Sequence, residues 1–97
     1  MKNIENIKKI LKKQKSILKE QFKIKEIGVF GSYVRGDQQT NSDLDVLVEF
    51  SRVPGLFKFI AMENYLSKIL KVKVDLVMKT ALKPKIGQQI LQEVIYL

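Results

Sequence analysis

The chain has 97 residues, of which 45% are hydrophobic and 29% are charged, so its composition is that of a globular protein rather than a disordered one. It contains no cysteine and no histidine, which excludes disulfides, thiolate or imidazole metal sites and the catalytic triads built on either residue. Any chemistry must therefore come from carboxylates, hydroxyls, lysine, arginine and backbone amides. Oxygen ligands of this kind favour hard metal ions such as Mg²⁺.

The net charge of +8 is concentrated at the N-terminus, because residues 1–25 hold nine lysines and only two glutamates. A lysine-covered helix is either the solvated outer face of a packed element or a surface that attracts a polyanion. No aromatic residue lies on the lysine face to stack a base, which argues against nucleic acid as a partner. Apolar residues with helical spacing are Ile4, Ile7, Ile10, Leu11, Ile17 and Leu18.

We expect one domain over residues 1–97, with a basic amphipathic helix at 1–22 and a catalytic core at 23–97. No apolar run approaches the roughly 18 residues that span a bilayer, and the N-terminus lacks the apolar stretch of a signal peptide. The expectation is a soluble cytoplasmic protein without a membrane partner.

The remaining pattern predicts strands and helices in alternation, in the order αβαβαβα, which is an α/β (α+β) arrangement. Predicted strands occupy residues 23–30, 43–50 and 71–78. Predicted helices occupy residues 32–35 and 56–70, and a last helix runs from Pro84 with an apolar stripe that ends at Ile95. Phe57, Phe59 and Tyr65 on the 56–70 helix leave room for an interface, although core packing is the favoured use for most of them.

Two aspartates lie two residues apart on the clearest predicted strand. Asp43 and Asp45 point to the same face, with Cα atoms about 6.5–7 Å apart, while Leu44 and Val46 face the core. Asp75 repeats this arrangement on the third strand. If the two strands are neighbours, three carboxylates meet on one surface and repel one another unless a cation neutralises them. Taken singly, each aspartate is typical of an exposed strand face or a strand end.

Gly31 and Ser32 stand at a strand-to-helix junction, where free backbone N–H groups and a hydroxyl can receive a phosphate. Arg35, one turn later, either points back toward the same site or forms an ion pair with an acid. Ser42 precedes the aspartates, and we favour capping of the strand start over ligand contact for its hydroxyl.

These motifs together resemble the nucleotidyltransferase superfamily that includes DNA polymerase beta and kanamycin nucleotidyltransferase. The likeness is strongest to the minimal nucleotidyltransferases, or MNT proteins, and covers roughly residues 24–97. It implies a three-stranded mixed sheet flanked by helices. The segments that carry the resemblance are residues 31–36 (GSYVRG), 42–50 (SDLDVLVEF), 73–77 (KVDLV) and 81–84 (ALKP).

The resemblance also implies a set of roles. Asp43 and Asp45 would ligate Mg²⁺, and Asp75 would complete the metal site and help to activate the attacking hydroxyl. Gly31 and Ser32 would hold the β- and γ-phosphates, and Arg35 would either offset triphosphate charge or form a structural ion pair. The reaction would transfer AMP from ATP to a hydroxyl and release pyrophosphate.

MNT proteins are paired with helical toxins of the HEPN family, so the resemblance implies an antitoxin that adenylylates a tyrosine of such a partner. A helical partner or a second copy of the chain, as in a homo-oligomer, would complete the site. Three alternatives remain open: an antitoxin that acts by binding alone, a nucleic-acid-binding module that uses the lysine-rich helix, and a nucleotidyltransferase with a small-molecule acceptor.

Overall fold

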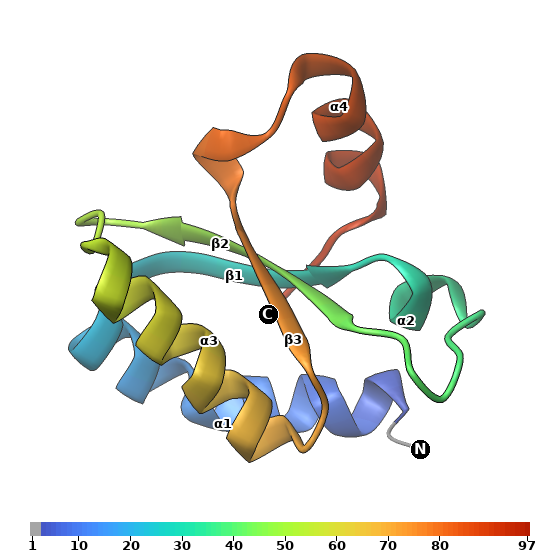
Figure 1. Ribbon diagram of the computed structural model, residues 1–97, viewed down its shortest axis with the longest axis horizontal. Helices are drawn as coiled ribbons and strands as arrows, with labels where there is room; N and C mark the ends of the chain where they lie inside the picture. Colours follow the sequence, from blue (N-terminus) through green and yellow to red (C-terminus); the bar gives the residue numbers. More distant parts are fainter. Residues whose placement is uncertain (1–2) are drawn as a thin grey trace.

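The computed structural model describes residues 3–97, and its helices and strands follow the predicted order up to the last one (Figure 1). A short 3₁₀ turn and a fourth strand are added near the C-terminus. The elements are α1 (Ile4–Phe22), β1 (Ile24–Phe30), α2 (Ser32–Arg35), β2 (Leu44–Phe50), α3 (Leu56–Leu70), β3 (Val74–Met78), the 3₁₀ turn η1 (Lys79–Ala81), α4 (Pro84–Glu93) and β4 (Ile95–Tyr96).

The sheet is mixed, as the resemblance implied, with strand order β3-β2-β1-β4. Strand β1 pairs antiparallel with β2 and with β4, whereas β2 pairs parallel with β3. The expectation of three strands was wrong by one, because the last helix ends at Glu93 instead of continuing to Ile95. Val94 is extended, and Ile95 and Tyr96 then add to the free edge of β1 opposite Val29 and Gly28.

All three predicted strands begin later than the pattern suggested: β2 by one residue, at Leu44, and β1 and β3 after a left-handed residue that ends the helix before them. Lys23 and Lys71 adopt left-handed conformations, with φ of 58° and 55°, and each ends the preceding helix. A left-handed residue cannot belong to a strand, so β1 starts at Ile24. Strand β3 starts only at Val74, three residues after Lys71.

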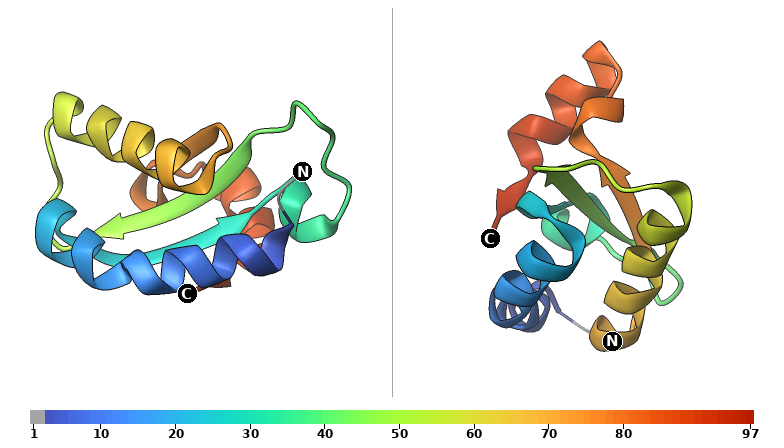
Figure 2. Two further views of the ribbon diagram at one scale, coloured as in Figure 1. Left: turned by 90° about the horizontal axis from the view of Figure 1, so that it is seen from below. Right: turned by 90° about the vertical axis from the view of Figure 1, so that its left-hand side faces the viewer.

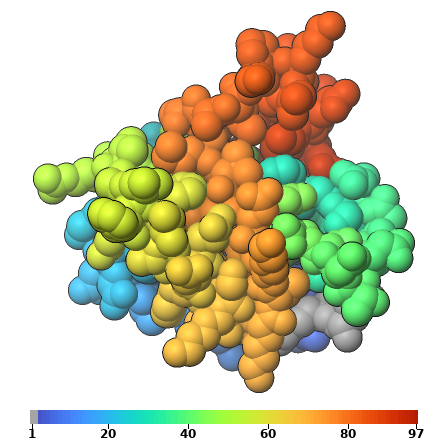
Figure 3. Space-filling model, in the orientation of Figure 1, coloured from blue at the N-terminus to red at the C-terminus, as the bar shows by residue number. Residues whose placement is uncertain are grey.

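Helices α1 and α3 lie side by side on one face of the sheet, while α4 stands on the other face (Figures 1 and 2). The space-filling view shows η1 and α4 rising above the rest of the surface (Figure 3). The core therefore forms between α1, α3 and the face of the sheet that these helices cover. Its completely buried residues include Ile7, Leu11 and Leu18 from α1, Leu44, Val46 and Val48 from β2, and Met62, Leu66 and Leu70 from α3.

The aromatic residues of α3 divide between core and surface. Phe59 packs on Phe50 with ring centroids 6.3 Å apart, and Tyr65 packs on Phe22 with centroids 5.9 Å apart. Phe57 is 87% exposed, so core packing accounts for two of the three aromatics. Within residues 3–97, no helix combines the length and apolarity needed to cross a membrane.

Candidate functional site

Asp45 and Asp75 lie on the sheet face opposite α1 and α3, near the start of β2 and β3, and Asp43 directly precedes β2. The parallel register places Asp45 directly opposite Asp75, and Asp43, two residues before Asp45, is close enough for its charge to act on that carboxylate. Leu44 and Val74, which alternate with the acids, are buried in the core. Burial of the apolar set thus forces the carboxylates onto the opposite, more open face.

The turn after β1 touches Asp45. Gly31 has φ +85° and ψ −154°, a conformation available almost only to glycine. A Cβ atom at Gly31 would lie 2.1 Å from Asp45 Oδ2, so a side chain there would displace the carboxylate. Both the backbone conformation and the space beside Asp45 therefore require glycine at this position.

Helix α2 is a single turn that presents Ser32 beside Gly31. The Gly31 carbonyl accepts hydrogen bonds from the Val34 and Arg35 N–H groups at 3.0 and 3.1 Å, and Gly36 ends the turn in the left-handed region. Tyr33 is buried and anchors the turn. The half-buried Ser32 hydroxyl makes no hydrogen bond to any other residue of the described chain, 3–97, and is available to a ligand.

Arg35 forms an ion pair, which is one of the two roles that its position in the sequence left open. Its Nη1 donates to Glu93 Oε1 at 2.9 Å, and its Nε donates to Asp37 Oδ2 at 3.4 Å. The other oxygen of Glu93 accepts the Gly31 N–H at 3.0 Å. Glu93 was missed by the sequence analysis, because it lies 62 residues from Gly31 in a segment predicted to be a continuous helix. No spacing in the sequence signals this contact.

Asp45 is the acid whose surroundings favour its protonated form. Burial, followed by the charges of Asp75 and Asp43, raises the pKa of Asp45 to about 6, against a smaller opposing effect of Arg35. A divalent cation at this face would offset the repulsion, and carboxylate oxygens are the donors that Mg²⁺ prefers. Within residues 3–97, no three acidic side chains are gathered closely enough to enclose a metal ion as they stand.

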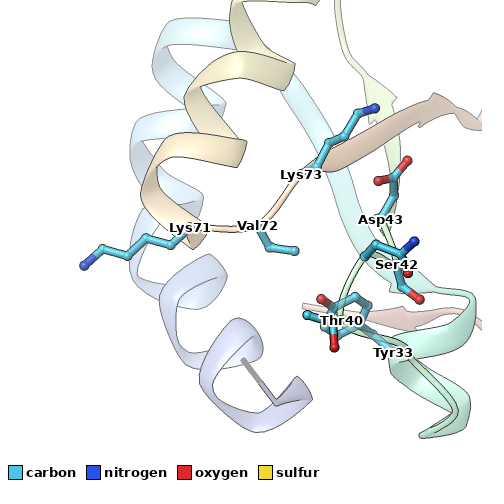
Figure 4. A pocket seen from close by; sticks show the side chains of 8 residues that line it. Tyr33, Thr40, Ser42, Asp43, Lys71, Val72 and Lys73 are labelled. Carbon is cyan, nitrogen blue, oxygen red and sulfur yellow. The ribbon is translucent and has the colours of Figure 1, made fainter. Parts of the chain in front are cut away.

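A pocket of about 430 Å³ opens next to Asp43, between the loop before β2 and the start of β3. Figure 4 shows Asp43 and Lys73 at one border and Tyr33 and Thr40 at another, while Lys71 points away. Ser42, for which strand capping was favoured, instead closes the loop, because its Oγ accepts the Gln39 N–H at 2.8 Å. This volume is within the range of small-molecule sites.

Known proteins match almost the whole chain. The Nucleotidyltransferase domain family matches residues 11–97. Protein adenylyltransferase MntA of Thermococcus cleftensis is 50% identical over 96 residues, which cover 99% of this chain and 97% of the relative.

Two solved structures share the fold. A candidate minimal nucleotidyltransferase has a TM-score of 0.83 and 30% identity, and the match covers 99% of this chain and 97% of that one. A toxin-antitoxin crystal structure with AMP-PNP has a TM-score of 0.74 and 28% identity, covering 94% of this chain and 71% of that one. Since the family match and the Thermococcus relative both extend over most of its length, this chain belongs to the nucleotidyltransferase domain family and is a nucleotidyltransferase.

Proposed function

We propose that the chain transfers AMP from ATP to a tyrosine hydroxyl of a HEPN-type toxin and thereby acts as its antitoxin. The observation that carries this proposal is the register that sets Asp45 opposite Asp75, with Gly31 in contact with Asp45. The adenylyltransferase name of the Thermococcus relative and the toxin-antitoxin structure with AMP-PNP support it. We place the reaction in the cytoplasm, where ATP is supplied.

The oxygen donors fit Mg²⁺ by their chemistry: Asp43 and Asp45 would ligate it and Asp75 would complete the site, once the three side chains converge further than they do without the ion. The raised pKa of Asp45 supports this assignment, because it reflects burial of the carboxylate and then the negative charges of Asp75 and Asp43, and a bound cation would offset both. When bound, Mg²⁺ would neutralise triphosphate charge and help to align the reacting groups.

The chain's own residues bind the triphosphate and move one proton. We assign the β- and γ-phosphates to the Ser32 hydroxyl and to those N–H groups of the Gly31 turn and of Arg35 that no acid occupies. The tyrosine oxygen attacks the α-phosphorus while the bond from that phosphorus to the bridging oxygen of pyrophosphate breaks. The hydroxyl proton passes to Asp75, and pyrophosphate leaves.

The open face of the sheet leaves room for a partner to supply the acceptor. Asp75 is exposed on β3, and the pocket beside Asp43 opens to the surface. A helical HEPN-type toxin placed against this edge would bring a tyrosine to the α-phosphorus. A second copy of the chain is the other protein that could complete the site.

The test is transfer of label from α-labelled ATP, in the presence of Mg²⁺, to the product of the neighbouring gene, which the proposal expects to be a HEPN-type toxin. We expect labelled toxin, and no label when the acceptor tyrosine is replaced by phenylalanine. Absence of label with a folded protein and the correct partner would reject the activity.

The variant Asp43→Asn with Asp45→Asn separates catalysis from simple binding. If adenylylation protects cells, this double variant loses both label transfer and protection from the toxin. Protection that persists without label transfer would instead show that the chain neutralises its partner by occlusion.

A further inference from the structure

One glutamate of the C-terminal segment reaches the phosphate-binding turn. Glu93, the last residue of α4, accepts the Gly31 N–H through Oε2 at 3.0 Å and an Arg35 N–H through Oε1 at 2.9 Å. Its side chain is mostly shielded, with 23% exposure, whereas that of Arg35 is 53% exposed. A single carboxylate therefore joins the two groups that the proposed function assigns to the triphosphate.

The sheet, rather than α4, fixes Glu93 in this place. Two residues after Glu93 the chain enters β4, which pairs with β1 at Gly28 and Val29. Gly28 permits this close approach, since a Cβ there would lie 2.7 Å from Val94 Cγ2 and 2.9 Å from the Ile95 carbonyl oxygen.

The last residue adds two further attachments. The Leu97 N–H donates to the Ile27 carbonyl at 2.9 Å, and the Lys15 ammonium donates to the Leu97 carbonyl. The segment that carries Glu93 is thus tied to β1 and α1 on the C-terminal side of the glutamate.

The contact leaves most of the guanidinium free. Arg35 has five N–H donors, of which one goes to Glu93 and one to Asp37. Because its side chain is half exposed, the remaining three can reach a ligand. Glu93 also holds the Gly31 peptide whose Cα lies against the Asp45 carboxylate. Glu93 therefore fixes the Gly31 peptide before the turn and Arg35 after it, and it leaves the Ser32 hydroxyl free.

We propose that Glu93 is a positioning residue for the nucleotide, which holds the Gly31 peptide and Arg35 in the orientation that receives the phosphates of ATP. This inference rests on the proposed function. The same contacts would also allow the opposite role, in which the Glu93 carboxylate blocks the phosphate site. It would then have to move away before ATP binds. The two roles predict opposite signs for the effect of removing the carboxylate.

The experiment measures the Kd of ATP with Mg²⁺ by calorimetry, and the KM for ATP and for the protein acceptor. We compare Glu93→Ala, Glu93→Gln and, as a matched control on the same turn of α4, Gln92→Ala, whose side chain is exposed. We expect Glu93→Ala to weaken ATP binding about 10-fold, in line with loss of charge-assisted hydrogen bonds. The KM for the acceptor and the melting temperature without nucleotide should stay close to wild type.

Glu93→Gln should fall between wild type and Glu93→Ala, because its amide oxygen can accept the Gly31 N–H but carries no charge for Arg35. ATP affinity that is unchanged or tighter in Glu93→Ala overturns the proposal, and tighter binding identifies a blocking residue. If the alanine variant does not fold, the glutamine variant decides alone, and wild-type affinity in it overturns the proposal. Wild-type protein that binds no ATP rejects the proposed function itself.

Discussion

The two faces of strand β2 have opposite properties, although they alternate along the same seven residues. One face carries Leu44, Val46 and Val48, which α1 and α3 bury completely. The other carries Asp45, which neighbours Asp75 across the sheet and Gly31 across the turn. Stability and chemistry are therefore assigned to alternate residues, so substitutions on the two faces should produce separable effects.

The face of β2 that carries Asp45 is accessible only along part of its length. Leu47, two residues after Asp45, is also buried, and it lies between Gly28 and Val77 on the neighbouring strands. Beyond it, the Glu49 carboxylate lies 3.9 Å from the Lys79 ammonium of η1. The C-terminal part of the chain thus closes this half of the face, which confines the candidate chemistry to the end where β2 and β3 begin.

The largest expected effect of a single substitution is on activity, from Asp45→Asn. Loss of the carboxylate should reduce label transfer by about 10²–10³-fold, the scale seen when one charge-stabilising group leaves an active site. The melting temperature should stay the same or rise, because the substitution removes a carboxylate whose charged form is disfavoured by burial and by the charges of Asp75 and Asp43. Transfer assays and thermal unfolding of the same sample measure both effects. Undiminished transfer, or loss of folding together with activity, would contradict the separation of the two faces.

The complementary substitution is Leu66→Ala in α3, on the side of the sheet where the core lies. Leu66 is completely buried in the core, so truncation should lower the free energy of unfolding by about 2–5 kcal/mol. Urea titration measures this change. Transfer per folded molecule should remain near wild type at a temperature where the variant is still folded. A specific loss of activity in fully folded Leu66→Ala protein would show that the core and the site are coupled.

Two glycines in the same turn distinguish backbone strain from contact with the site. Gly36→Ala places a side chain at φ +80° with no atom within 4 Å of its Cβ. We therefore expect the free energy of unfolding to fall by about 1–2 kcal/mol, which is the cost of a left-handed backbone conformation for alanine. Gly31→Ala adds a collision with Asp45 Oδ2 to its own backbone strain of about 1–3 kcal/mol. Gly31→Ala should therefore lose transfer activity, whereas Gly36→Ala should lose only stability. Equal activity in the two variants would show that the contact with Asp45 does not matter.

The sequence predicted the buried face of β2 and the positions of the acids correctly. It predicted less well the contacts that hold the turn after β1. Strict alternation over residues 43–50 is a local signal, so the opposite faces of Leu44 and Asp45 could be predicted from it. Strand direction is not local, and the mixed sheet came from the family resemblance instead. Strand β4 and the contact of Glu93 with Gly31 depend on pairing across about 60 residues, and the apolar pattern at the C-terminus fits a helix equally well.

In metal-free protein, the raised pKa of Asp45 should make the free energy of unfolding depend on pH. Its folded pKa of about 6 lies above the unfolded value near 4, so the folded state binds more protons in that interval. The free energy of unfolding should therefore fall as the pH rises from about 4 to about 6, and this contribution should be constant above that range. A fully shielded group would contribute about 3 kcal/mol, and partial exposure reduces this to about 1 kcal/mol.

Urea titrations of wild type and Asp45→Asn across this pH range isolate the effect. The difference between the two curves should grow in favour of the variant as the pH rises. Parallel curves would show that burial and the neighbouring acids do not raise the pKa of Asp45 in the folded protein.

The smallest effect is expected on the outer face of α1, far from both faces of β2. Lys12 and Lys13 are exposed and the helix is held by buried Leu11 and Leu18, so Lys12→Gln with Lys13→Gln should change the free energy of unfolding by less than about 0.5 kcal/mol. Label transfer to the proposed HEPN-type partner should be unaffected at physiological salt. If these lysines bound nucleic acid, the wild type would show an affinity that falls steeply with salt and the variant a shallower slope. Such a result would assign a separate role to α1, whereas a loss of transfer would extend the active surface to this helix.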